Sequence, residues 1–229
     1  MKTFYAGHDK KYMEYRAQGK PGWDVSDNGY AVFQSDTKDV INRGNAPSSG
    51  FLLELGCGAG NMTVWFAERG YTAHGIDIAP TAIEWARERA AAGNTMVQFT
   101  VGDVVQLAAY SDSSFDFVFD GHCLHCIIGK DRAVLLKNVF RVLKPGGYVM
   151  FNTMCGPVIQ ERIENYDPVS RCTVYGDIAS RYFGDPDDII AEIKTAGFEI
   201  IQCKIEAGDS EKSNHYMVIE AGSRLSRGN

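Results

Sequence analysis

Apolar runs and amphipathic segments alternate along the chain from residue 51 onward. Short apolar runs bounded by Gly, Pro or Asp are typical of buried strands, whereas apolar residues spaced three or four apart indicate helices. The pattern predicts strands over 51–55, 71–78, 95–103, 114–120, 148–154, 198–205 and 214–221. It predicts helices over 61–70, 80–93, 131–143 and 185–197.

This alternation predicts the fold class. Strand–helix–strand units form right-handed crossovers and a parallel sheet that is buried on both faces. The last two strands are joined only by residues 206–213, without a helix, so the last strand should turn back antiparallel. We expect a doubly wound, mostly parallel, Rossmann-like α/β sheet. Ligands of such sheets bind at the carboxyl ends of the strands.

The helix over 185–197 has clear signals at both ends. Asp185 can cap its first turn, Pro186 suits the first helical position, and Gly197 can close the last turn.

Three segments lie outside the alternating core, which we place at 51–221. Residues 1–50 precede the first strand, and we expect them to form a helical lid. Residues 155–183 are longer than an ordinary connection, so we expect an insert there that lines an acceptor pocket. Residues 222–229 are expected to form a flexible tail.

A glycine-rich turn follows the first expected strand in the sequence LELGCGAGN. Gly56, Gly58 and Gly60 are spaced two apart, and glycine permits close approach of a ligand to the backbone. A dinucleotide fingerprint would place its third glycine at position 61, where Asn stands. A P-loop lysine is also missing, so nucleoside triphosphates are disfavoured. The spacing alone is also compatible with a purely structural turn.

Two aspartates end the next two strands. Asp77 lies where an acidic side chain accepts hydrogen bonds from a ribose diol, and its alternative role is a helix cap. Asp103 is placed to accept from an exocyclic adenine amine, and its alternative role is a cap or turn.

The ordered motifs LELGCGAGN, GIDIAPTAIEWA, FTVGDVVQL, FDFVFDGHCLHCI and LKPGGYVMF resemble those of class I S-adenosylmethionine-dependent methyltransferases, over about residues 50–221. The resemblance implies a seven-stranded sheet and S-adenosylmethionine as cofactor. It implies that Glu54 and the glycine turn hold the methionine end, that Asp77 binds the ribose and Asp103 the adenine, and that Asp120 faces the methionine and the acceptor. The cofactor-binding residues implied are Glu54, Gly56, Cys57, Gly58, Gly60, Asp77, Ile78, Asp103, Val104 and Asp120.

The segment GKPGWDVSDNGYAVF, residues 19–33, is similar to one that precedes the first strand in small-molecule members of the thiopurine and tellurite-resistance type. That likeness places Trp23 near the cofactor sulfonium, because an aromatic face attracts a cation. Packing within a lid is the alternative role for this tryptophan.

The stretch DGHCLHCI after the fourth expected strand is the main candidate for catalysis. His122 or His125 could act as a general base, since imidazoles titrate near neutral pH, or either could simply pack in the loop. Cys123 and Cys126 form a C-x-x-C without a second pair, so we expect no metal site. An arsenic acceptor held by cysteine thiolates stays open.

The acceptor itself is less defined. Candidate contacts in the insert are Tyr166, Arg171, Tyr175, Arg181 and Tyr182. An arginine there could pair with a carboxylate, although a solvated surface position is the alternative for each one. No N-P-P-[YF] motif follows the fourth strand, which disfavours methylation of nucleobase amines.

Composition narrows the classes further. The formal net charge of −6 argues against a nucleic-acid acceptor, because phosphate backbones favour a basic surface. No signal-peptide pattern or long apolar span is present, so we expect a cytoplasmic monomer or homodimer without a membrane partner. The six cysteines are expected to be free thiols.

The sequence therefore predicts an S-adenosylmethionine-dependent methyltransferase that transfers a methyl group to O, N or S of a small molecule. Two alternatives are a non-catalytic cofactor-binding or regulatory protein on the same scaffold, and a nicotinamide-dependent oxidoreductase.

Overall fold

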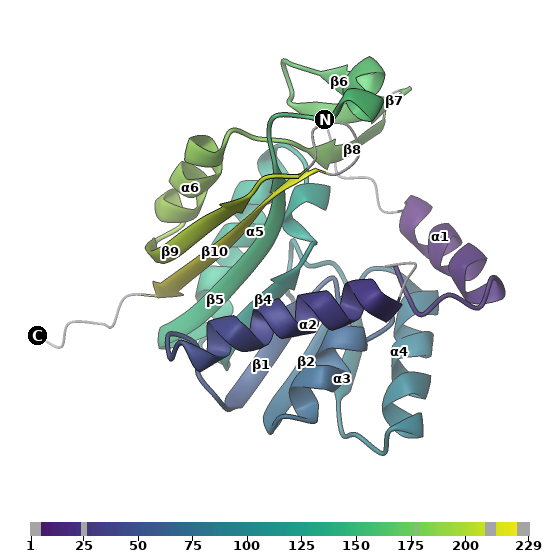
Figure 1. Ribbon diagram of the computed structural model, residues 1–229. Coiled ribbons are helices and arrows are strands. Elements are labelled where there is room, and N and C mark those ends of the chain that lie inside the picture. Colours follow the sequence, from purple (N-terminus) through teal and green to yellow (C-terminus); the bar gives the residue numbers. More distant parts are fainter. Residues whose placement is uncertain (1–5, 24–26, 177, 209–213, 224–229) are drawn as a thin grey trace, which may run out of the picture.

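The computed structural model describes residues 6–23, 27–176, 178–208 and 214–223. They form a seven-stranded sheet in the order β3-β2-β1-β4-β5-β10-β9 (Figure 1). Its strands are β1 (Gly50–Leu55), β2 (Tyr71–Asp77), β3 (Gln98–Val101), β4 (Phe115–Gly121), β5 (Leu143–Cys155), β9 (Phe198–Glu206) and β10 (His215–Ser223). β10 is antiparallel to both neighbours, and the pairs among β1 to β5 are parallel. The predicted α/β fold with an antiparallel last strand is confirmed.

The described helices are α1 (Ala6–Ala17), α2 (Asp27–Asn42), α3 (Asn61–Ala67), α4 (Pro80–Ala92), α5 (Lys130–Val142) and α6 (Pro186–Thr195). Two short 3₁₀ helices, η1 (Leu124–Cys126) and η2 (Gln160–Asn165), lie in loops. Among the described residues, no helix is long and apolar enough to cross a membrane.

Helices cover both faces of the sheet, and successive residues of a strand point to opposite sides, so both sets of side chains are buried. Leu52 of β1 packs in a cluster with Phe66 of α3, and Leu53 packs in another with Leu135 of α5. Helices α2, α3 and α4 cover one face, and α5 and α6 cover the other (Figure 1). This is the doubly wound arrangement.

The cap signals of the last helix form as expected. Asp185 is the N-cap of α6, and its Oδ1 accepts a hydrogen bond of 3.0 Å from the Asp187 amide. Gly197 follows the helix in the left-handed region with φ of 110°, and its amide donates to the Lys194 carbonyl. Local chemistry thus determines both ends of α6.

Several boundaries differ from expectation. β5 begins at Leu143 rather than Tyr148, because Leu143 already pairs with Phe115 before a register shift. The insert forms a three-stranded sheet of β6 (Tyr166–Asp167), β7 (Cys172–Tyr175) and β8 (Ile178–Tyr182) that the sequence pattern did not predict. β10 extends to Ser223, so the expected tail loses its first two residues, and 224–229 lie outside the described residues.

The first helix is fastened to α4. Arg16 pairs with Glu84 at 3.1 Å and with Glu88 at 2.6 Å. Near the other end of α1, the carboxylate of Asp9 accepts from the Thr81 amide at 2.8 Å. α1 is therefore held along α4 from Thr81 to Glu88.

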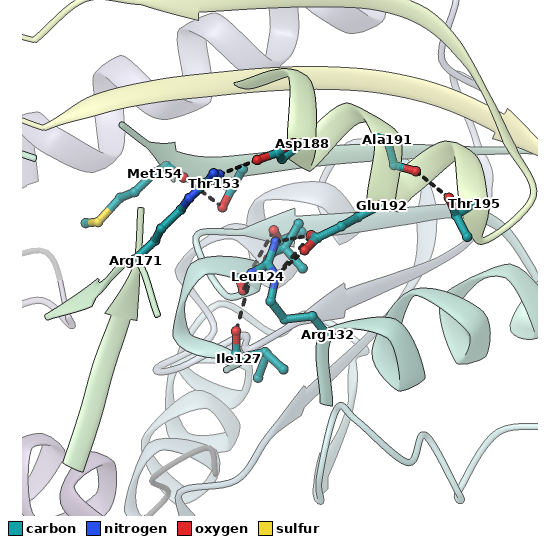
Figure 2. Close-up of polar contacts among 11 residues, drawn as sticks. Leu124, Ile127, Arg132, Thr153, Met154, Arg171, Asp188, Ala191, Glu192 and Thr195 are labelled. Carbon is teal, nitrogen blue, oxygen red and sulfur yellow. Dashed lines mark hydrogen bonds and ion pairs between the residues drawn. The ribbon is translucent and has the colours of Figure 1, made fainter. Parts of the chain in front are cut away.

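A buried arginine links the loop after β4 to the rest of the domain. Arg132 of α5 is 3% exposed and donates to the carbonyls of Leu124 at 2.8 Å and Ile127 at 3.3 Å. It also makes a bidentate pair with Glu192 of α6 (Figure 2). Its guanidinium lies 4.1 Å from the ring centroid of Tyr182 in the insert. One side chain therefore contacts three elements that border the same end of the sheet.

We predict that Arg132→Met lowers the free energy of unfolding by roughly 3 kcal/mol, because it leaves two loop carbonyls and one carboxylate without their donor. Chemical denaturation measures the change. The exposed Arg171–Asp188 pair (Figure 2) is the control, and Arg171→Met should leave stability nearly unchanged. A similar loss for both variants would contradict the structural role of Arg132.

Candidate functional site

A cavity of about 770 Å³ lies at the carboxyl ends of β1, β2 and β4. Its floor comes from the glycine turn after β1 and from the loop after β4, and its walls come from α1, α2, the insert and β10. The volume falls within the range of roughly 300–1,000 Å³ that is usual for ligand pockets. Its position is the one that parallel α/β sheets use for ligands.

The first two glycines of the turn make room for this cavity. Gly56 and Gly58 have φ of 63° and 52° and both line it. A Cβ on Gly56 would lie 2.8 Å from the Cβ of Cys123, and one on Gly58 would collide with the hydroxyl of Tyr12 from α1. Side chains at these positions would therefore intrude on the site or displace its cover.

The third glycine has a different role. Gly60 does not line the cavity, and a Cβ there would lie 2.8 Å from Cβ of Ala86 and 2.9 Å from the Phe99 ring. Gly60 therefore allows the start of α3 to pack against α4 and β3, which is a structural role.

Glu54 brings a buried carboxyl group to the cavity. It is 3% exposed and accepts a short hydrogen bond from the Thr63 hydroxyl. Burial raises the pKa of Glu54 to about 8, although the Thr63 hydrogen bond lowers it in part. A cation beside this carboxyl group would stabilise its ionised form, which burial disfavours.

Asp77 lies at the end of β2 and also lines the cavity. Its carboxylate accepts from the Gly58 amide at 2.9 Å and from the Ala79 amide at 2.8 Å, so it holds the glycine turn in place. Burial raises the pKa of Asp77 to about 6, and these backbone hydrogen bonds limit the rise. The cap position of α4 belongs to Ala79, so Asp77 is not the helix cap.

Asn61 contributes an acceptor that the sequence analysis did not single out. Its Nδ2 donates to the Pro21 carbonyl at 3.3 Å, whereas its buried Oδ1 has no hydrogen-bond partner among the described residues. Because Asn61 lines the cavity, this unpaired oxygen lies at the border of the space that a ligand would occupy.

A family model described as a methyltransferase domain matches residues 53–151. The chain is 30% identical over 171 residues to the 2-heptyl-1-hydroxyquinolin-4(1H)-one methyltransferase of Mycobacteroides abscessus, a match that covers 74% of this chain and 71% of that protein.

The chain belongs to the S-adenosylmethionine-dependent methyltransferase family.

Two further similarities concern part of the sequence and the fold. The chain is 32% identical over 121 residues to phosphoethanolamine N-methyltransferase 1 of Arabidopsis thaliana, which covers 52% of this chain and only 24% of that longer protein. A solved S-adenosylmethionine-dependent methyltransferase from Methanosarcina mazei superposes with a TM-score of 0.66 at 23% identity, and the match covers 81% of this chain and 98% of that one.

The cavity of this methyltransferase fits its cofactor, S-adenosylmethionine, which carries an ammonium group, a sulfonium and a ribose diol. Buried acceptors that suit these cations and hydroxyl donors lie together on Glu54, Asp77 and Asn61. Cys57, Ile78 and Val104 line the same region. These residues would hold the cofactor, while Trp23 lines the cavity beside His8, Tyr12 and Tyr15.

Asp120 differs from the expectation. It is fully buried and does not line the cavity. Its Oδ1 accepts from the amides of Cys123 at 2.7 Å and Leu124 at 3.1 Å, and burial raises its pKa to about 7. Asp120 therefore shapes the loop rather than facing a ligand, because the chain after β4 folds back onto it.

Asp103 also lies outside the cavity lining, although its neighbour Val104 belongs to it. The carboxylate of Asp103 accepts from the Val105 amide at 2.8 Å, as in a turn. Its predicted contact with adenine stays a prediction.

The two candidate histidines both line the cavity but have different surroundings. His122 has φ of 73°, and its ring stacks on Phe33 of α2 at 4.9 Å and lies 5.0 Å from the Tyr216 ring of β10. His125 is buried, and its Nδ1 accepts from the Met154 amide at 3.3 Å. Burial lowers the pKa of His125 well below its ordinary value, so this imidazole is neutral and its Nε2 carries the proton.

Of the five acceptor contacts expected in the insert, only Arg181 lines the cavity. Arg171 pairs instead with Asp188 of α6 (Figure 2), and Tyr182 packs against Arg132. Tyr175 is 51% exposed, and Tyr166 lies in β6 outside the lining. β7 and β8 are only four and five residues long, and the sequence does not indicate which of their side chains point into the cavity.

Sequence reasoning missed several residues of the lining: Tyr12, Tyr30, Phe33, Asn61, Arg162 and Tyr216. Only Asn61, directly after the glycine turn, and Tyr216, near the start of the last strand, carried a positional signal.

Three cysteines, Cys57, Cys123 and Cys126, line the methyltransferase cavity as free thiols. Burial raises the pKa of each, whereas ligation of a soft centre needs thiolates. Across the described part of the chain, no group of three or more His, Cys, Asp or Glu is placed to hold a metal ion.

We predict that cofactor binding releases protons at pH 7. The pKa of Glu54 is about 8 and that of Asp77 about 6, so Glu54 is largely protonated before the cation arrives. A cation beside these groups lowers both pKa values, and affinity should rise as the pH increases from 6 to 8.5.

Calorimetry of S-adenosylmethionine binding in phosphate and Tris buffers measures the proton release as a difference in apparent enthalpy. Glu54→Gln should abolish most of that difference. Equal enthalpies in both buffers for the unsubstituted protein would contradict the prediction.

Proposed function

We propose that this protein transfers the methyl group of S-adenosylmethionine to an O, N or S atom of a small molecule. The observation that carries the proposal is that cofactor-side and acceptor-side residues line one cavity. Glu54 and Asp77 belong to the same lining as His122 and Tyr216. A methyl donor and an acceptor can therefore meet there away from solvent.

The bound cofactor supplies a methyl group that its sulfonium already activates. The protein then has to align the acceptor with that methyl, and such alignment contributes roughly 7–11 kcal/mol to a displacement. Phe33 and Tyr216 offer aromatic walls on either side of His122, which suit a flat organic acceptor. These contacts support a small molecule rather than a polymer as the acceptor.

His122 is our candidate for the general base. Its left-handed backbone conformation is uncommon outside glycine, and such strain gathers at functional sites. His125 is suited to donation, because its Nδ1 already accepts from the Met154 amide. We assign proton removal, where the acceptor requires it, to His122 and orientation of the acceptor to His125.

The N-terminal helices and the insert are proposed to form the cover of the site. Tyr12 of α1 lies against Gly58, and the guanidinium of Arg181 in the insert lies 5.9 Å from the Trp23 ring. The two covering segments thus meet above the glycine turn, where closure would exclude water.

Asp77→Asn is expected to weaken S-adenosylmethionine binding about 10- to 100-fold at pH 8, because it removes the charge from hydrogen bonds to the ribose. Calorimetry measures the affinity. Asp116→Asn is the control, since Asp116 pairs with Lys144 outside the cavity. Unchanged affinity in Asp77→Asn would remove the ribose assignment, and tight NADH binding without a response to S-adenosylmethionine would overturn the proposed function.

We expect His122→Asn to reduce methyl transfer by about 10²–10⁴-fold while cofactor affinity stays the same. Asparagine tolerates the left-handed backbone at this position, so the variant isolates the imidazole. Transfer of label from the cofactor to acceptors found in a small-molecule screen is the measurement. His74→Asn, outside the cavity lining, should retain full rate.

Two further results bear on the assignment. A protonated imidazole cannot accept a proton, so the rate of the unsubstituted enzyme should fall in acid. Full activity of His122→Asn would show that His122 is not the general base, so that the enzyme works by alignment alone or draws its base from another residue. Cofactor binding without turnover of any small molecule would support the non-catalytic alternative.

A further inference from the structure

Two arginines of the insert face the acceptor side of the cavity. Arg162 comes from η2 and Arg181 from β8, and both belong to the cavity lining. They are separate in sequence, but η2 packs against β7, and β7 pairs with β8. Both arginines therefore lie on the side of the cavity that the insert forms. Positive charge at this wall is a local feature, because the protein as a whole has a net charge of −6.

Six other arginines in the described ranges form ion pairs with carboxylates: Arg16 with Glu84 and Glu88, Arg43 with Glu220, Arg69 with Glu68, Arg132 with Glu192, Arg141 with Asp112, and Arg171 with Asp188. Arg87 and Arg89 donate to backbone carbonyls. The guanidinium of Arg181 donates to the carbonyl and hydroxyl of its neighbour Ser180 at 2.8 and 3.4 Å. Over residues 6–23, 27–176, 178–208 and 214–223, neither Arg162 nor Arg181 forms an ion pair with a carboxylate.

The two guanidinium groups act on one region. Both exert electrostatic influence on His125 and on Tyr216. The guanidinium of Arg181 lies 5.9 Å from the ring centroid of Trp23, and that of Arg162 lies 5.9 Å from the ring centroid of Phe183. Each cation therefore has a cation–π contact with an aromatic ring. Two cations around a partly desolvated space repel each other, and an anion between them removes that repulsion.

We propose that the methyl acceptor carries a carboxylate or phosphate group that Arg162 and Arg181 bind together. The inference rests on the proposed function, and it specifies the chemical class of the acceptor. Guanidinium groups bind such oxyanions through parallel N–H donors. The body of the acceptor would then lie against Phe33, His122 and Tyr216, which line the next part of the cavity.

The opposite part of the cavity supports this orientation. Asp36 and Asp39 of α2 and Glu206 and Glu220 of the last two strands line it, together with Lys204 and Arg43. Lys204 pairs with Glu206 and Arg43 with Glu220, so both cations there already have carboxylate partners and the two aspartates leave an excess of negative charge. An acceptor with one charged group therefore has one favoured direction, with its anion at the insert and the rest of the molecule toward His122.

The test uses the full chain loaded with S-adenosylhomocysteine, the demethylated cofactor product, and three small probes. 4-Hydroxybenzoate and phenyl phosphate carry the anion, and neutral 4-hydroxybenzamide is their matched control. Calorimetry should show at least one anion binding about tenfold or more tightly than the amide. The better of the two anions distinguishes a carboxylate acceptor from a phosphate acceptor.

Variants then locate the site. Arg162→Gln and Arg181→Gln should each weaken the preferred anion about tenfold and leave the amide unaffected, whereas Arg171→Gln, whose arginine pairs with Asp188 outside the cavity, should behave like the unsubstituted protein. Affinity for S-adenosylhomocysteine, measured first for every protein, verifies that each variant is folded.

The inference is overturned if the unsubstituted protein binds both anions no more tightly than the amide, including the case in which none of the three binds. It is also overturned if the variant that carries both Arg162→Gln and Arg181→Gln retains full anion affinity. Failure to bind S-adenosylhomocysteine or S-adenosylmethionine at all would instead refute the proposed function, so the two failures are distinguishable.

Discussion

The geometry of the site depends on how the loop after β4 is held. Arg132 donates hydrogen bonds to the carbonyls of Leu124 and Ile127. The carboxylate of Asp120 accepts hydrogen bonds from the amides of Cys123 and Leu124. Both groups are buried, so water does not compete for these hydrogen bonds. With its backbone fixed at both ends, the loop can hold His122 in an uncommon conformation and keep His125 against β5.

Charge is distributed unevenly around the cavity, and this organises its chemistry. Carboxyl groups desolvated at the ends of β1 and β2 suit a cationic cofactor, whereas the guanidinium groups of the insert suit an anion. The buried carboxylates Glu54 and Asp77 destabilise the empty site in their ionised form, because burial opposes their ionisation. Ligand binding relieves that cost, which links affinity to pH.

Much of the fold could be predicted from the sequence because its signals are local. Apolar runs that alternate with amphipathic segments predict the strands, and Asp185 and Gly197 predict the two ends of α6. The insert could not be predicted in this way, since its strands are only two to five residues long and the apolar cluster that they bury with Ile128 is small. Asp77 and Asp120 occupy equivalent strand ends, yet one lines the cavity and the other lies beneath it. The difference comes from the path of the following loop, which a spacing pattern does not contain.

The contact between Gly58 and Tyr12 changes how substitutions in the glycine turn should be interpreted. A methyl group at position 58 would collide with the Tyr12 hydroxyl of α1. α1 contacts α4 through Arg16 and Asp9. A side chain at position 58 would push Tyr12 away and so weaken the packing of α1 on α4, although α1 lies about 40 residues earlier in the chain. Weak cofactor retention in such a variant would therefore reflect faster escape through an opened cover, a change in dissociation rate, rather than the loss of a contact.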